Sequence, residues 1–299
     1  MDPSLFRVEF RAMACSCEIV VAAANATEAE SAMRLAVEEV NRIEQKYTRY
    51  KPTSIISRIN LAAGKESIIC DDETLSLLNF AETLFQQSDG LFDISSGVLR
   101  RAWDFKIPKI PSQDDIDSLL GLVSWPEIER ENNEIKLPKE GMEIDFGGFG
   151  KEYATDKAVT VLIESGIKSG YVNLGGDLRV VGPKPSGNDW VMGIVDPRIK
   201  GKLIASIPVA TGALATSGDY EKFFELKGQR YSHILSPRTG NSVNFWRSIS
   251  ILAPLSVTAG SYSTIAMLKE AEGIPWLENI GMAYFAIDHT GKVYQRESN

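Results

Sequence analysis

Two glycine-rich turns constrain the fold of this chain more than any other feature. Each follows an apolar segment and leaves a carboxylate beside its glycines: residues 144–151 (IDFGGFGK) and 171–177 (YVNLGGD). The first turn leads into a predicted helix over 151–165, whose N-terminal N–H groups, together with Lys151, favour an anion. It has neither the Walker spacing nor the dinucleotide fingerprint. One such turn is equally consistent with close packing, but two of them predict a ligand that carries phosphate.

His233 is the second feature that bears chemistry, because the chain has only two histidines. Residues 222–226 and 230–235 are predicted to pair as strands across the turn at Lys227 and Gly228. A lone histidine on a strand is more often a hydrogen-bonded structural residue than a catalyst, and the local sequence leaves both interpretations open. His289 lies in a predicted exposed turn and is expected to be inert.

The composition excludes several classes of protein. The chain has 299 residues, of which 43% are hydrophobic, enough for a large core in one domain or in two closely packed halves. A net charge of −8 argues against nucleic acid and anionic membranes as partners. No basic and apolar leader begins the sequence, so a cytoplasmic location and no direct membrane insertion are expected.

The same composition limits the metals that the chain can bind. Three cysteines and two histidines make a zinc site improbable, and a bound metal should be a hard, oxygen-ligated ion such as magnesium. Cys15 and Cys17 share one face of a predicted strand, and we interpret them as buried thiols.

Hydrophobic periodicity predicts the order of the elements. Strands are expected at 6–10 and 15–22, a long helix at 27–47, a polar loop at 48–60 and a helix that starts at Asp71 and Asp72 and ends at Gln87. The segment 88–97 is predicted to be a loop, either a tight turn or a ligand-binding one. A hairpin follows at 128–137. The later elements are successive antiparallel strands at 178–182, 190–195, 203–208 and 213–217, a strand at 247–253, helices at 258–269 and 272–279, and strands at 283–287 and 292–296.

Several segments also carry short motifs. Residues 145–156 are similar to Asp-x-Gly-Gly-x-x-Lys-Gly-Tyr-Ala-x-Asp, 50–60 to aromatic-x-Pro-Asp-Ser-Glu-Ile-Ser-x-x-Asn and 90–93 to Gly-x-Phe-Asp. Met13 stands at the place of a Met-Gly-Thr turn in the same set of motifs. Three further segments are identical to motifs of this set: 173–177 (NLGGD), 215–220 (ATSGDY) and 232–234 (SHI). In this order, over nearly the whole chain, these motifs resemble those of the ApbE family of flavin transferases, the FAD:protein FMN transferases.

The resemblance implies a fold and a reaction. The fold would be α+β, with antiparallel sheets flanked by helices in a single domain over residues 1–299, and with FAD in a cleft between two intimately packed halves. Family enzymes use magnesium to move FMN from FAD onto a threonine or serine hydroxyl of a redox membrane protein, and they release AMP. Some members instead hydrolyse FAD to FMN and AMP.

The resemblance also assigns roles to residues. His233 would be the general base, and the metal site would include the backbone oxygen of Gly148 and the hydroxyl of Thr264. Asp177, which closes the second glycine-rich turn, is added to the expected FAD contacts. These contacts are Met13, Tyr50, Leu91, Phe92, Asp93, Asp145, Lys151, Asp177 and Ile234.

Among the positions that depart from the family pattern, three have lost an acidic side chain. Gly260 stands where the family has an aspartate that binds magnesium, Ser236 stands where it has aspartate, and Ile55 where it has glutamate. The loss of an anionic ligand at position 260 predicts weaker metal binding, which Gly260→Asp should reverse, although FAD phosphates can supply part of the charge. Two alternatives to transfer follow: an FAD-binding protein with little turnover, and an FAD pyrophosphatase.

Overall fold

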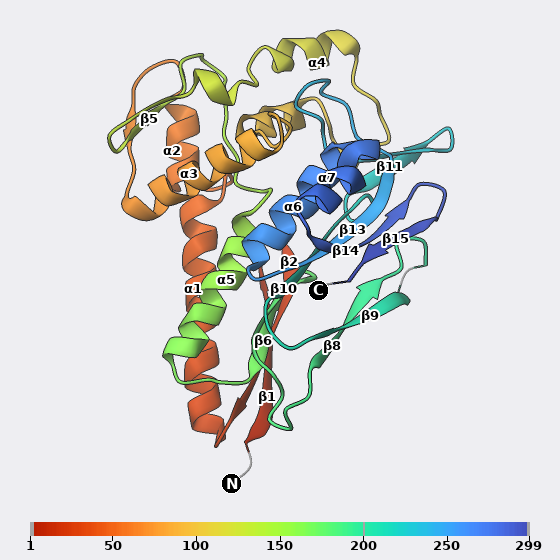
Figure 1. Ribbon diagram of the computed structural model, residues 1–299. Coiled ribbons are helices and arrows are strands. Elements are labelled where there is room, and N and C mark those ends of the chain that lie inside the picture. Colours follow the sequence, from red (N-terminus) through yellow and green to blue (C-terminus); the bar gives the residue numbers. More distant parts are fainter. Residues whose placement is uncertain (1–2, 200, 298–299) are drawn as a thin grey trace.

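An eight-stranded antiparallel sheet runs through the computed structural model, which describes residues 3–199 and 201–297 (Figure 1). Its strand order is β1-β2-β6-β7-β10-β13-β14-β15, and each neighbouring pair is antiparallel. Helices flank this sheet, so the expected α+β class is confirmed. The sheet joins strands from both ends of the chain, which is a reason to propose a single domain.

The strands have the following bounds. Those of the main sheet are β1 Ser4–Ala12, β2 Cys15–Ala23, β6 Gly170–Leu174, β7 Asp177–Gly182, β10 Ala213–Gly218, β13 Trp246–Ala253, β14 Ala283–Asp288 and β15 Val293–Arg296. Two hairpins and a small three-stranded sheet are formed by β8 Trp190–Val195 with β9 Leu203–Val209, β11 Phe223–Leu226 with β12 Gln229–Ser232, and β3 Ile68–Ile69, β4 Glu129–Glu131 and β5 Glu134–Lys136.

The helices follow the predicted order. The α-helices are α1 Ala26–Tyr47, α2 Ile55–Leu61, α3 Asp72–Gln87, α4 Gln113–Leu120, α5 Gly150–Glu164, α6 Ser256–Leu268 and α7 Gly273–Asn279. Short 3-10 helices are η1 Ile94–Arg101, η2 Trp125–Glu127 and η3 Glu270–Glu272. Among the described residues, none of these helices combines the length and the apolar character needed to cross a membrane.

The two faces of the sheet are covered differently, as alternation along β2 shows. Ile19 and Val21 belong to the core with α1 and α5, whereas Val20 between them packs with Trp190 and Met192 of β8. Side chains of consecutive strand residues point to opposite faces, so the helices cover one face and the β8–β9 hairpin part of the other. Figure 1 shows α1, α5 and α6 side by side over the sheet.

Helix α5 is the central element of the helical layer. It contacts both α1 and α6, and small buried residues such as Ala154 and Ala158 permit this close approach. The Asp156 carboxylate accepts hydrogen bonds from the N–H groups of Ser256 and Val257, both at 2.9 Å. Asp156 therefore caps the start of α6 from α5 and fixes the position of the two helices relative to each other.

Three local predictions were wrong. The strands at 178–182 and 213–217 are neighbours in the sheet, and β8–β9 leaves it as a separate hairpin, because the second face of the sheet also needs an apolar cover. Helix α2 begins inside the predicted polar loop, where the Ser54 hydroxyl accepts from Ser57 N at 3.0 Å. The predicted loop at 88–97 ends in η1 from Ile94, which Asp93 caps.

Candidate active site

The first glycine-rich turn delivers Lys151 to the end of the second. Lys151 lies in the first turn of α5, and its Nζ atom forms an ion pair with Oδ2 of Asp177. Asp177 begins β7 and also accepts a hydrogen bond from Thr216 N of β10 at 3.0 Å. Two predicted FAD contacts are therefore in direct contact, at a point where three segments of the chain meet.

The Met13 turn lies beside the second glycine-rich turn. Met13 and Ala14 have positive φ angles of 50° and 60°, and Met13 N donates to Oε1 of Glu44 at 2.8 Å. A Cβ at Gly175 would lie 2.9 Å from the Cys15 sulfur, so this glycine is required for the close approach. The same Cβ would lie 3.8 Å from the side chain of Lys151, so the two turns and Lys151 share one location.

Cys15 and Cys17 are free thiols; Cys17 is buried as expected, whereas Cys15 is only half-buried. The Sγ atoms of Cys15 and Cys17 are 3.7 Å apart. A hydrogen bond between the two thiols is the main cause of their pKa shifts: it raises the pKa of Cys15 and lowers that of Cys17 to about 7.

Asp145 lies between two arginines that the sequence did not single out. Its Oδ2 atom is 2.6 Å from Nη1 of Arg100 and 3.3 Å from Nη1 of Arg49, and its Oδ1 atom accepts from Gly147 N at 2.9 Å. The carboxylate thus orders the glycine-rich turn and keeps two guanidinium groups beside it. These cations add positive potential on the side of the turn away from Asp177.

Phe92 and Asp93 are both buried. Phe92 packs against the first glycine-rich turn, and Asp93 accepts hydrogen bonds from its neighbours. A Cβ at Gly148 would lie 2.8 Å from the ring of Phe92, so Phe92 closes on the first glycine-rich turn. Asp93 accepts from Ser95 N at 2.8 Å, from the Ser95 hydroxyl at 2.6 Å and from Trp125 N at 3.1 Å. Burial raises the pKa of the Asp93 carboxyl, while these hydrogen bonds act in the opposite direction.

Tyr50, Leu91 and Ile234 differ in exposure. The Tyr50 side chain is 81% exposed, with the guanidinium of Arg49 6.0 Å from its ring centroid. An aromatic face left this open is available to stack on a ligand ring. Leu91 packs against the core cluster that contains Ile234, so these two residues lie in one apolar region.

His233 follows β12 and is held by its backbone, whose N–H donates to the Lys222 oxygen at 3.0 Å. Its Nδ1 atom is shielded from solvent and has no hydrogen-bond partner within the described part of the chain. Burial, followed by the charges of Lys222 and Arg100, lowers the pKa of His233 to about 4. The imidazole is therefore neutral at physiological pH and able to accept a proton.

The predicted metal site is rich in oxygen atoms. The Thr264 and Ser217 hydroxyls are 2.9 Å apart, and Ser217 also contacts Ser263 at 2.7 Å. Beside them lies Glu152, a buried carboxylate that the sequence did not single out, and its Oε2 atom has no hydrogen-bond partner in the part of the chain that the structure describes. These hard donors fit magnesium. Among the residues that the structure describes, no group of three or more His, Cys, Asp and Glu side chains is arranged to hold a metal ion.

The predicted residues form two groups on either side of the 144–151 turn. Lys151, Asp177 and Met13 gather at one end, and Asp145, which binds Arg100, and Phe92 contact the turn at the other. The sequence missed Arg49, Arg100, Glu152 and Ser217. Two of them had a signal: the motif quoted above has glycine at the position of Glu152, and Ser217 belongs to the segment 215–220 (ATSGDY).

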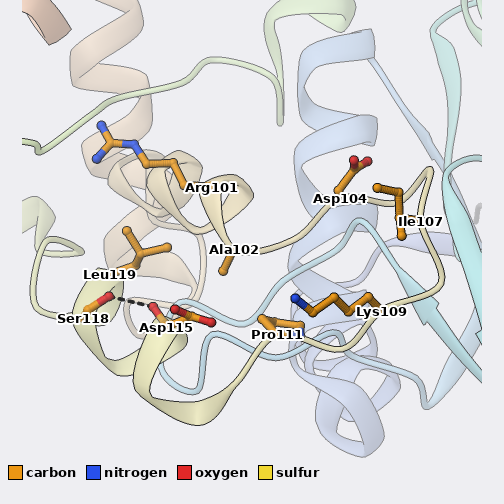
Figure 2. A pocket seen from close by; sticks show the side chains of 9 residues that line it. All are labelled: Arg101, Ala102, Asp104, Ile107, Lys109, Pro111, Asp115, Ser118 and Leu119. Carbon is orange, nitrogen blue, oxygen red and sulfur yellow. Dashed lines mark hydrogen bonds between the residues drawn. The ribbon is translucent and has the colours of Figure 1, made fainter.

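A pocket of about 450 Å³ lies away from these residues, between α4 and the segment after η1 (Figure 2). Figure 2 shows Asp104 and Lys109 on that segment and Asp115 and Leu119 on α4. None of the predicted site residues lines it, and its charged groups do not converge on one point. We therefore place the candidate site by the contacts of the glycine-rich turns and not by this pocket.

Known proteins resemble this chain over most of its length. A sequence model described as the ApbE family matches residues 13–286. A Klebsiella pneumoniae protein named FAD:protein FMN transferase is 27% identical over 232 residues, which cover 76% of this chain and 72% of that protein. A protein of the same name from Treponema pallidum is 27% identical over 278 residues, covering 83% of this chain and 77% of its own.

Solved structures share the fold. The apbe protein of Thermotoga maritima superposes with a TM-score of 0.91 at 29% identity and covers 98% of this chain and 97% of its own. The structure titled flavin transferase ApbE from Vibrio cholerae has a TM-score of 0.88 at 22% identity, covers 99% of this chain and 98% of its own, and is similar in fold.

Proposed function

This chain belongs to the ApbE family, and from that premise we propose that it is an FAD:protein FMN transferase that moves FMN from FAD onto a serine or threonine hydroxyl of an acceptor protein. Its relatives named FAD:protein FMN transferase support this proposal. The observation that carries it is the pair of His233, whose buried Nδ1 atom has no hydrogen-bond partner among the described residues, and the glycine-rich turn at 144–151, where Asp145 binds Arg100.

For this reaction the chain must bind FAD and must accept one proton. The acceptor hydroxyl oxygen forms a bond to the phosphorus of the FMN half of FAD. The bond from that phosphorus to the oxygen shared with AMP breaks, and its electron pair leaves with AMP. The hydroxyl proton passes to the neutral imidazole of His233. Lys151 and the α5 N-terminus would hold the pyrophosphate through their positive potential.

Tyr50 and the apolar residues would hold the flavin. The exposed ring of Tyr50 offers a flat face for stacking, and Leu91 and Ile234 offer an apolar wall. Met13 belongs to the turn beside Lys151, so we propose it as a contact near the pyrophosphate. Phe92 would act by packing on Gly148 and thereby shaping the phosphate turn.

Magnesium would be held by the Gly148 carbonyl and the Thr264 hydroxyl. The Ser217 hydroxyl and the Glu152 carboxylate lie beside them. When bound, the metal would neutralise the charge on the pyrophosphate. The orphaned Oε2 atom of Glu152 and the paired hydroxyls of Thr264 and Ser217 support such a site in this chain. The acceptor is proposed by analogy as a redox membrane protein subunit.

One incubation separates transfer from its alternatives. The protein is mixed with FAD, magnesium and a serine- or threonine-containing peptide from a candidate acceptor, and all products are identified by mass spectrometry. A peptide that gains the mass of an FMN group supports transfer. Free FMN with AMP and an unmodified peptide would instead support a pyrophosphatase, and intact FAD bound to the protein would support a flavin-binding protein.

A further inference from the structure

The side chain of Glu152 fills the space that a side chain at position 260 would need. A Cβ built on Gly260 would lie 2.5 Å from Cγ of Glu152 and 2.8 Å from both its Cδ and its Oε1 atom. These distances are far below van der Waals contact, so a side chain at position 260 would force the Glu152 carboxylate to leave its place. The helices cannot easily move apart, because Asp156 of α5 caps the start of α6.

The Glu152 carboxylate is buried with few partners. Glu152 is 8% exposed, and its Oε2 atom has no hydrogen-bond partner among residues 3–199 and 201–297. Its Oε1 atom lies 3.7 Å from Nζ of Lys151. That lysine is already paired with Asp177. A buried carboxylate is costly unless it is neutralised, paired or coordinated to a metal. Glu152 therefore has one oxygen free for a ligand.

The groups around this carboxylate are oxygen donors. Thr264 lies one helical turn after Gly260 on α6, and its hydroxyl is 2.9 Å from that of Ser217. The Ser263 hydroxyl donates to the Gly260 carbonyl at 2.9 Å. Gly148 precedes Glu152 by four residues, in the turn that leads into α5. Carboxylate, hydroxyl and carbonyl oxygens together are the ligands of a hard divalent cation.

We propose that Glu152 is the anionic ligand of the divalent cation in this site, and that it enters from α5 the space that a side chain at position 260 of α6 would occupy. The inference rests on the proposed function for the presence of the cation. The family pattern that this chain resembles has glycine at the position of Glu152 and aspartate at that of Gly260. In this chain the carboxylate therefore comes from α5 instead of α6, but it occupies the same location. Glycine at position 260 then removes no charge from the site. Under this proposal, Gly260→Asp alone is not expected to tighten magnesium binding.

The test measures metal binding and not turnover. Mn²⁺ is titrated into the protein with ADP, which offers two phosphates but no flavin, and free Mn²⁺ is followed by electron paramagnetic resonance. Glu152→Gln keeps the shape and removes the charge, and the exchange variant Glu152→Gly with Gly260→Asp moves the carboxylate back to α6. Glu164→Gln is the matched control, because Glu164 is an exposed carboxylate on the same helix. Thermal unfolding checks that each variant folds.

We expect Glu152→Gln to weaken Mn²⁺ binding about tenfold or more and the exchange variant to bind within about threefold of the native protein. Glu164→Gln should match the native protein, and Gly260→Asp alone should bind no more tightly, because Glu152 occupies the space. Native affinity in Glu152→Gln, or no recovery in the exchange variant, would overturn the proposal. A native protein that binds Mn²⁺ through Glu152 but transfers no FMN would instead count against the proposed function alone.

Discussion

Nη1 of Arg100 lies 2.6 Å from Oδ2 of Asp145, and the charge of this arginine also acts on His233. Arg100 thus connects the turn proposed to bind phosphate with the histidine proposed to take the proton. Its positive charge helps to keep that histidine neutral, so the same group that favours an anion also maintains the base in its active form.

Replacing His233 by alanine should remove the base but leave the binding groups in place. General-base catalysis contributes about 10²–10⁴-fold, so we expect the rate of FMN transfer to fall by roughly this factor while the affinity for FAD stays nearly unchanged. The measurements are single-turnover transfer by mass spectrometry and an FAD fluorescence titration. His289→Ala is the control, since His289 is exposed and contacts Phe245. An unimpaired His233→Ala protein would give His233 a structural role only.

The depressed pKa of His233 predicts how activity and stability change with pH. Transfer should be constant from neutral pH down to about 5 and should fall near pH 4, where the imidazole gains its proton. Between pH 6.5 and 4 the unfolded chain binds this proton before the native one does, so the free energy of unfolding falls as pH falls, by about 3 kcal/mol in total. Urea unfolding at several pH values, in native protein and His233→Gln, should show a smaller slope in the variant.

Asp93 should matter for folding more than for flavin. Its buried carboxylate accepts from Ser95 and from Trp125 N, and alanine would leave these donors without a partner. We expect Asp93→Ala to lower the free energy of unfolding by about 2–4 kcal/mol, measured by urea unfolding. The exposed Asp114 of α4 gives the matched control, Asp114→Ala, with little change. Native stability combined with lost FAD binding in Asp93→Ala would show a direct contact with FAD instead.

Tyr50 should show the opposite pattern. Because its side chain is 81% exposed, Tyr50→Ala should leave the free energy of unfolding within about 0.5 kcal/mol of the native value. Stacking of an aromatic side chain on a base is worth about 1–3 kcal/mol, so FAD affinity should fall roughly 5- to 100-fold, and Tyr50→Phe should retain it. Equal FAD affinity in Tyr50→Ala and native protein would remove Tyr50 from the site.

The sequence predicted the elements better than their contacts. Periodicity located α1 and α5, and the glycine pairs indicated the turns that bring Lys151 to Asp177. The departure of β8–β9 from the sheet was not predictable. A strand has the same sequence pattern whether it pairs with the next strand along the chain or with a later one. The hydrogen bond from Trp125 N to Asp93 was also hidden, since Trp125 lies on a distant segment.

The mutual exclusion of side chains at positions 152 and 260 also restricts how the family can diversify. A lineage that changes one position first passes through a protein with both carboxylates in one space or with neither. Substitutions at the two positions should therefore be strongly non-additive, each tolerated only in the background that the other provides. Relatives with an acid at the position of Glu152 should carry glycine at that of Gly260. The identities of these two residues would then show which relatives share this origin.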